Sequence, residues 1–135
     1  MEPAVTKEVA IKDIEKWLDK VGVAESEREE NKTFIEKITN AIEDGRVFIE
    51  DDFLKQILKF PIKDKDGNPV TKDLKYKTSL SLEEVHPKLQ LVKATDAHGS
   101  MLAYVSALTG VSSGMLKKMN SQDYKISQAI AVFFA

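Results

Sequence analysis

The stretch FLKQILKFPIKDKDGNPVTKDLKYKTSL, residues 53–80, decides the fold of this chain. Residues 53–62 and 72–80 alternate apolar and polar side chains with the period of two that is typical of β-strands. Between them, Asp66-Gly67-Asn68-Pro69 is a strong turn signal, and Pro61 favours an edge position or the end of the first strand. The sequence therefore predicts an antiparallel hairpin.

The two faces of this hairpin are predicted to differ in character. Its apolar face carries Leu54, Leu58, Phe60, Ile62, Leu74, Tyr76, Thr78 and Leu80. Its polar face carries Lys55, Lys59, Lys75, Lys77 and Ser79, with Ile57 between the first two lysines. Because neighbouring side chains on a strand point to opposite faces, one face should be apolar and the other rich in lysine.

Helical periodicity is found on both sides of the hairpin. Residues 6–20 predict a helix with Thr6 as its N-cap, and a second helix should begin at Ser26, in a capping box with Glu29, and end at Gly45. A short strand, residues 46–50, then precedes the hairpin. After residue 80 we expect several short helices, with capping signals at Ser81 and Asn120.

This order of periods predicts an α+β fold in a single domain, residues 1–135. Its parts are an N-terminal helical pair at residues 1–45, a small antiparallel hairpin sheet at 46–80 and a C-terminal cluster of short helices at 81–135. The sequence contains no internal repeat and no low-complexity linker that would mark a second domain.

Composition narrows the classes of function. The chain has 135 residues, 20 Lys and Arg against 22 Asp and Glu, and no Cys, which excludes a disulfide scaffold, a Cys zinc site and a thiol nucleophile. The net charge is −7 over residues 1–52, +4 over 53–80 and +1 over 81–135. This balance argues against a generally basic nucleic-acid binder.

No constellation of residues predicts catalysis or metal binding. His86 and His98 are isolated from other metal-ligand types, and the turn at Asp64–Asn68 lacks the first and last ligands of a calcium loop. The chain contains no Gly-x-Ser-x-Gly elbow and no phosphate loop. We therefore expect a protein that is not an enzyme and has no cofactor.

The lysines of the hairpin raise a separate possibility, which is binding to nucleic acid. Single-strand binders need cations and stacking aromatics on one surface, whereas the alternation places Phe60 and Tyr76 on the face opposite the lysines. We therefore expect no meaningful DNA or RNA affinity. A nucleic-acid-associated phage or bacterial regulator that uses the Lys-rich hairpin face stays an alternative.

A series of motifs follows the hairpin. Residues 101–110, MLAYVSALTG, end in Leu-Thr-Gly, and Leu116, Met119 and the pair Asp123-Tyr124 come next. From about residue 54 to 130 the chain resembles the small tail assembly chaperones of tailed bacteriophages and prophages. The resemblance implies a non-enzymatic protein of the bacterial host cytoplasm that transiently binds the tape measure protein and keeps it soluble during tail assembly. A stable structural tail component is a further alternative, and a homo-oligomer is possible.

A partner-binding surface is predicted in the C-terminal helices. The chain ends in AVFFA, residues 131–135, and an apolar end must dock on its own core or on another chain. The candidate partner-binding residues are Leu102, Val105, Ile130, Phe133 and Phe134. The alternative is that this segment is a core helix of the protein itself. We expect no membrane partner, because no apolar run is long enough to span a bilayer and the first ten residues, with Glu2 and Glu8, lack the apolar part of a signal peptide.

Overall fold

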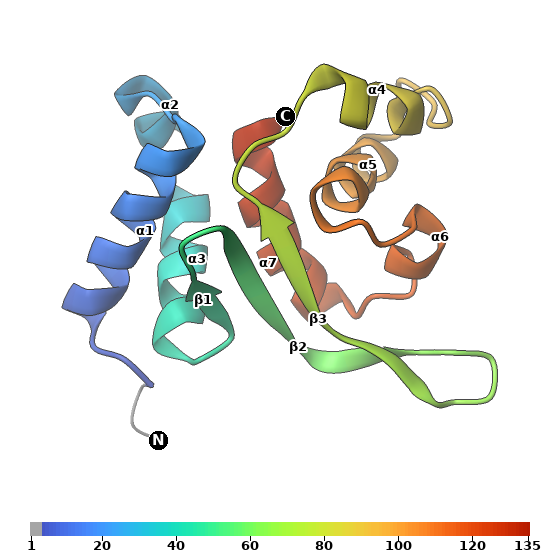
Figure 1. The fold of residues 1–135 in the computed structure, drawn as a ribbon, viewed down its shortest axis with the longest axis horizontal. Coiled ribbons are helices and arrows are strands. Elements are labelled where there is room, and N and C mark those ends of the chain that lie inside the picture. Colours follow the sequence, from blue (N-terminus) through green and yellow to red (C-terminus); the bar gives the residue numbers. More distant parts are fainter. Residues whose placement is uncertain (1–3) are drawn as a thin grey trace.

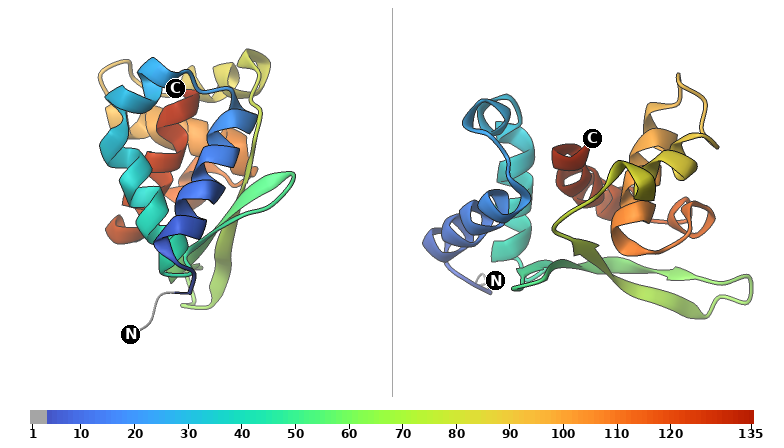
Figure 2. Two further views of the ribbon diagram at one scale, coloured as in Figure 1. Left: turned by 90° about the vertical axis from the view of Figure 1, so that its left-hand side faces the viewer. Right: turned by 45° about the horizontal axis from the view of Figure 1, so that its top comes forward.

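The computed structural model of the protein describes residues 4–135, so Glu2 lies outside the described residues. A three-stranded antiparallel sheet has the order β1-β2-β3, with the N-terminal helices toward one end and the C-terminal helices toward the other (Figure 1). Both groups of helices lie on the same side of the sheet (Figure 2, right). The strands are β1 (Val47–Ile49), β2 (Phe53–Lys63) and β3 (Pro69–Lys77). N-terminal helices, an antiparallel sheet and short C-terminal helices confirm the predicted α+β class.

The N-terminal helices differ from the prediction at one point. Helix α1 (Lys7–Val21) begins as expected, because the Thr6 hydroxyl accepts a hydrogen bond from the backbone N–H of Val9. The predicted second helix is two helices, α2 (Glu25–Glu30) and α3 (Lys32–Glu43), and α2 begins one residue before Ser26 with no side-chain cap. The capping box of Ser26 and Glu29 was therefore wrong.

The physical reason lies in the short segment around α2. Arg28 turns back toward the preceding connection, where its Nε donates to the carbonyl of Val23 at 3.0 Å and its guanidinium pairs with Asp19 at 2.8 Å. The side chain of Asn31 donates to the carbonyl of Glu27, which separates α2 from α3. Helix α3 then packs along α1, and both run side by side in Figure 2 (left).

The hairpin contains a bulge that the alternation did not predict. Ile57 pairs with Asp73 and Ile62 with Thr71, so residues 58–61 of β2 lie opposite residue 72 alone. The carboxylate of Asp123, on a C-terminal helix, accepts the backbone N–H groups of Lys59 and Phe60 at 2.8 and 3.0 Å. Asp123 thereby supplies hydrogen-bond acceptors for backbone N–H groups of the bulge, where the regular pairing with β3 is interrupted.

Beyond the bulge the hairpin extends past the helices (Figure 2, right). Its turn is the predicted one: Gly67 has a φ of 82°, and the Asp64 carboxylate accepts the backbone N–H groups of Asp66 and Asn68 at 2.9 Å. A positive φ of this kind favours glycine, which explains its place in the turn.

The C-terminal helices are α4 (Leu82–Leu89), α5 (Ala97–Thr109), α6 (Ser113–Leu116) and α7 (Ser121–Ala131), followed by the 3₁₀ turn η1 (Val132–Phe134). The predicted capping box of Ser81 and Glu84 is present at the start of α4. Asn120 caps α7 by accepting the N–H of Gln122, whereas Asp123 serves the bulge of β2. Among the described residues, no helix combines the length and the hydropathy needed to cross a membrane.

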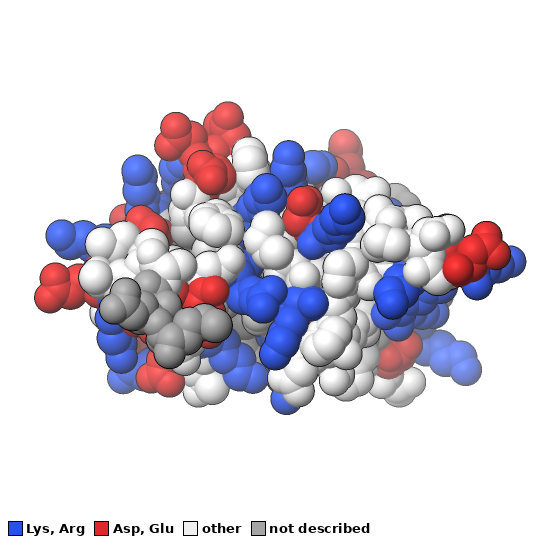
Figure 3. Space-filling model, turned by 90° about the horizontal axis from the view of Figure 1, so that it is seen from below, with Lys and Arg blue, Asp and Glu red and all other residues white. Residues whose placement is uncertain are grey.

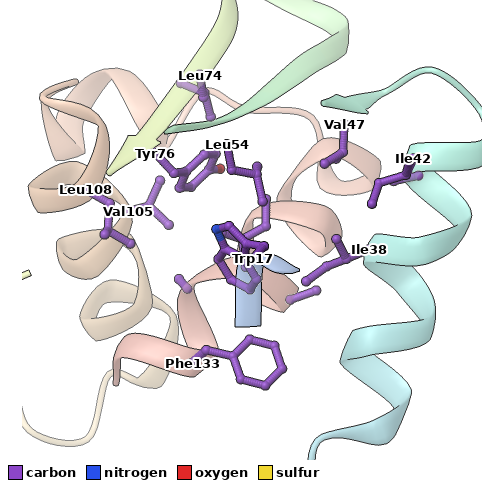
Figure 4. Close-up of a cluster of buried hydrophobic side chains, with 14 of the residues drawn as sticks. Trp17, Ile38, Ile42, Val47, Leu54, Leu74, Tyr76, Val105, Leu108 and Phe133 are labelled. Carbon is purple, nitrogen blue, oxygen red and sulfur yellow. The ribbon is translucent and has the colours of Figure 1, made fainter. Parts of the chain in front are cut away.

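One cluster of buried side chains joins the three parts of the chain. Trp17 of α1 lies at its centre, with the ring of Phe133 edge-on at 5.9 Å (Figure 4). The ring of Phe134 is also edge-on to Trp17, at 6.1 Å. Ile38 and Ile42 of α3, Leu54 and Tyr76 of the sheet, and Val105 and Leu108 of α5 complete its centre. The core thus lies between the inner face of the sheet and the helices.

Candidate protein-binding surface

The face of the sheet turned away from the helices is built from alternate residues of the three strands and from the two residues that flank β1. We call the following residues the outer sheet face: Arg46, Phe48, Glu50, Phe53, Lys55, Ile57, Asp73, Lys75 and Lys77. The register fixes how they lie. Phe48, Lys55 and Lys75 form a middle row across the three strands. On one side of this row, Phe53 of β2 pairs with Lys77 of β3. On the other side, Ile57 of β2 pairs with Asp73 of β3.

Apolar side chains are spread over this face rather than buried beneath it. Phe48 is 43 % exposed, and Phe53 and Ile57 are half-buried. Their strand neighbours on the inner face, Val47 and Leu54, are fully buried. The outer sheet face therefore combines solvent-accessible aromatic and aliphatic side chains, which is unusual for a face that only meets water.

Cations lie among these apolar groups. Lys and Arg side chains gather over the middle of the molecule when it is viewed from the side of the sheet (Figure 3). The Nζ of Lys75 lies 5.3 Å from the centre of the Phe53 ring, within the range of a cation–π contact. At the bulge, the Nζ of Lys59 lies 5.7 Å from the ring of Phe60.

One lysine of the face is already engaged. Lys77 forms an ion pair with Glu84 at 2.6 Å, and its hydrogen bond, followed by those from Ser81, holds the pKa of the Glu84 carboxyl below its usual value. Among residues 4–135, Arg46, Lys55 and Lys75 form no ion pair. On the outer sheet face, these three cations have no acidic partner among the described residues and are available to a partner.

Phe60 does not lie on the face that the alternation predicted. The strict alternation placed it on the apolar face with Tyr76, but its side chain is 46 % exposed, because the bulge breaks the alternation after Leu58. Tyr76 is buried as expected. Aromatic and cationic side chains therefore do share an exposed surface, so the reason given above against nucleic-acid binding was wrong in this respect.

A buried polar network lies on the inner face. The Tyr76 hydroxyl is 2.6 Å from Gln56 Oε1 and 2.8 Å from the hydroxyl of Ser127 on α7. The Gln56 side chain also donates to the backbone carbonyl of Asp123 at 2.9 Å. Burial raises the pKa of Tyr76, so its hydroxyl stays protonated and available for these bonds. The network fixes β2 and β3 to α7 and thereby holds the outer sheet face in place.

The predicted partner-binding residues of the C-terminal helices lie mostly inside the protein. Leu102, Val105, Ile130 and Phe133 are buried in the core cluster, and Phe134 is half-buried beside Trp17. These four buried residues belong to the core of the protein itself, which was the alternative to a partner-binding surface. No partner can reach them in this conformation, whereas Phe48, Phe53 and Ile57 on the outer face of β1 and β2 are accessible to solvent.

An open depression of about 720 Å³ lies between the end of α3, the bulge of β2 and the start of α7. Its walls mix charges of both signs: Lys37, Lys59, Lys125 and Arg46, which this depression shares with the edge of the sheet, lie beside Glu43 and Asp44. The carboxylate of Asp123, which also lines it, is fully used by the bulge. This composition favours no particular ligand.

The histidines have local structural partners. His98 Nδ1 lies 2.8 Å from the hydroxyl of Tyr124, and His86 Nε2 lies 3.2 Å from the side-chain nitrogen of Gln90. Burial, and to a smaller extent the carboxylate of Asp96, raises the pKa of Tyr124. Within residues 4–135 no three His, Asp or Glu side chains come together as metal ligands.

Comparison of the chain with protein-family models, with curated proteins and with solved structures gives no match. The resemblance of residues 54–130 to tail assembly chaperones therefore stays a prediction from sequence motifs.

Proposed function

We propose that this protein is a non-enzymatic tail assembly chaperone of a tailed bacteriophage or prophage, which transiently binds the tape measure protein in the host cytoplasm. The observation that carries the proposal is the outer sheet face, where Phe48, Phe53 and Ile57 lie beside cations that form no ion pair with any described residue. A chaperone of a long helical chain needs exposed apolar surface, and this face supplies it.

The motif residues behind the resemblance support the proposal through their structural roles. Asp123 holds the bulge of β2, and Tyr124 contacts His98 at the start of α5. Gly110, which ends the Leu-Thr-Gly motif, has a φ of 78° and terminates α5. These residues shape the fold that presents the sheet, and none of them needs to react with a ligand.

The test is co-expression with the tape measure protein encoded near this gene. We expect the chain to keep that protein in the soluble fraction and to co-purify with it. A matched control is co-expression with a variant that carries Phe48→Ser and Phe53→Ser. If the tape measure protein is equally insoluble with and without the wild-type chain, the proposed function is refuted.

One observation favours a second candidate, a nucleic-acid-associated regulator. The cation–π contacts of Lys75 with Phe53 and Lys59 with Phe60 place cations and aromatic rings on one exposed side. Filter binding of labelled single-stranded DNA and RNA at increasing salt distinguishes this candidate, because phosphate contacts give a steep loss of affinity with salt.

A further inference from the structure

Resting on the proposed function, we infer that the outer sheet face binds an amphipathic segment of the partner that carries acidic side chains beside its apolar ones. The sequence resemblance names a partner but neither a surface nor the chemistry of the bound segment. Both follow from how the side chains alternate over the three strands.

The apolar part of the site is formed by Phe48 of β1 with Phe53 and Ile57 of β2. Phe48 lies opposite Lys55, and Phe53 and Ile57 flank Lys55 along the same strand. The three apolar side chains thus surround one lysine. The two most exposed large apolar side chains of the described residues lie outside this group: Leu82 is the first residue of α4, and Leu91 follows the end of that helix.

The cations of the outer sheet face favour a partner segment that carries acidic side chains. Lys55 and Lys75 are directly opposite each other in the register, although like charges in that position repel. Arg46 lies beside Ile57, to which its carbonyl is hydrogen-bonded. A carboxylate placed between Lys55 and Lys75 would relieve their repulsion while the adjacent rings cover apolar side chains of the same segment. Complementary charge then selects the partner and steers its approach.

Acidic groups on the face favour a protein segment over nucleic acid. Glu50 and Asp73 lie at opposite corners of the outer sheet face and would repel a continuous phosphate backbone. A peptide can place its carboxylates opposite Lys55 and Lys75 and avoid the two acidic corners.

The chain's own N-terminal helices do not match the site well. Helix α2 is acidic, with four Glu and one Arg, but exposes no large apolar side chain. Helix α1 exposes Val9 and Ile11 but carries equal numbers of acidic and basic residues. Helix α1 offers no net negative charge to the lysines of the face, and α2 offers no large apolar side chain to its rings, so a different chain fits the outer sheet face better than these helices of a second copy.

The experiment uses the full chain and two synthetic probes. The first is an amphipathic peptide of about 20 residues, long enough to form a helix, with Leu on one face and Glu beside it. The second has Lys in place of every Glu. Fluorescence anisotropy at physiological salt measures their affinities, and we expect the Glu peptide to bind at least about tenfold tighter, as charge complementarity requires.

Two variants locate the binding. The double variant Lys55→Glu and Lys75→Glu replaces one like-charged pair by another, so it should fold, and we expect it to reverse the preference between the peptides. The variant Phe48→Ser should weaken the Glu peptide by about tenfold, as is common for a central aromatic contact. The matched controls, Lys12→Glu with Lys16→Glu on α1 and Leu91→Ser, should bind like the wild type.

Each remaining outcome overturns the inference. If all variants bind the Glu peptide with the affinity of the wild type, the peptide binds outside the outer sheet face. Displacement of the Glu peptide by a single-stranded oligonucleotide assigns the face to nucleic acid, and a wild-type dimer that Phe48→Ser dissociates assigns it to a second copy. The proposed function is tested separately, by co-expression of the tape measure protein with the variants. If that protein stays soluble with Phe48→Ser and also with the double Glu variant, the chaperone function is supported, and the assignment of binding to the outer sheet face is refuted.

Discussion

The inner and outer faces of the sheet are made from the same strands but have opposite surroundings. On β2, Leu54, Gln56 and Leu58 point inward and are at most 3 % exposed. Their neighbours Phe53, Lys55 and Ile57 point outward and are half-buried. The inner side chains contact α5, α7 and α1 through the core, whereas no described helix covers the outer ones.

The difference teaches that stability and binding can be separated by one residue along a strand. Substitutions on the inner face remove core contacts and leave cavities, so they should act on the free energy of unfolding. Substitutions on the outer face remove groups that already meet water, so they should act on association. The following predictions test this division, beginning with the largest effect.

The C-terminal tail should behave like the inner face. Phe133 is 8 % exposed and its ring contacts Trp17, so Phe133→Ala should lower the free energy of unfolding by roughly 3–5 kcal/mol. Phe134→Ala should cost clearly less, because its side chain is only half-buried. Urea denaturation followed by tryptophan fluorescence measures both. Equal, small effects would show that the tail does not belong to the core.

Adjacent residues of β2 give the most direct comparison. Leu54 is fully buried, and Leu54→Ala should cost about 2–5 kcal/mol. Lys55→Ala, one position away, should change stability by about 0.5 kcal/mol or less. Both values come from the same denaturation experiment. If Lys55→Ala were as destabilising as Leu54→Ala, the outer face would be part of the folding core.

The bulge connects the two faces, and Asp123 tests its role. Asp123→Ala would leave the backbone N–H groups of Lys59 and Phe60 without their acceptors, at a cost of about 2 kcal/mol. Asp123→Asn keeps one acceptor oxygen and should cost less. Hydrogen exchange at residues 59 and 60 reports the local effect. Unchanged exchange in Asp123→Ala would show that the bulge is held by other contacts.

Much of the fold was accessible from the sequence because its signals are local. The hairpin turn at Gly67, the cap at Thr6 and the capping box at Ser81 each depend on residues within a few positions of one another. The same is true of the alternation from Leu54 to Leu58, which the structure confirms.

What failed depends on contacts between residues far apart in the chain. The exposure of Phe60 follows from a hydrogen bond to Asp123, more than sixty residues later. The division of α2 from α3 is an exception, because it accompanies a local hydrogen bond from the Asn31 side chain to the carbonyl of Glu27 that the capping pattern did not predict. The apolar outer face was missed because Phe48 and Phe53 lie on different strands and become neighbours of Lys55 only through the register. The burial of Phe133 likewise depends on Trp17, at the other end of the chain.

The smallest predicted effect concerns the one lysine of the outer face that is already paired. The hydrogen bond from Lys77, with those from Ser81, lowers the pKa of Glu84, so this interaction stabilises the fold above the unfolded-state pKa and is lost as the pH falls through the folded-state pKa. Lys77→Met should therefore lower the melting temperature slightly at neutral pH, and the difference from wild type should disappear in acid. Because both groups are solvent-exposed, the change should be the smallest of this series.

The matched control for this prediction is Lys75→Met, which removes a lysine from the same strand and the same face but breaks no ion pair among the described residues. Its melting temperature should follow the wild type at every pH, whereas its affinity for an acidic partner should fall. The opposite pattern would be a pH-dependent loss of stability in Lys75→Met together with a loss of binding only in Lys77→Met. It would mean that Glu84 does not pair with Lys77 in solution. Lys77 would then be the cation that a partner meets, and the division between structural and binding groups on the outer sheet face would have to be redrawn with Lys75 on the structural side.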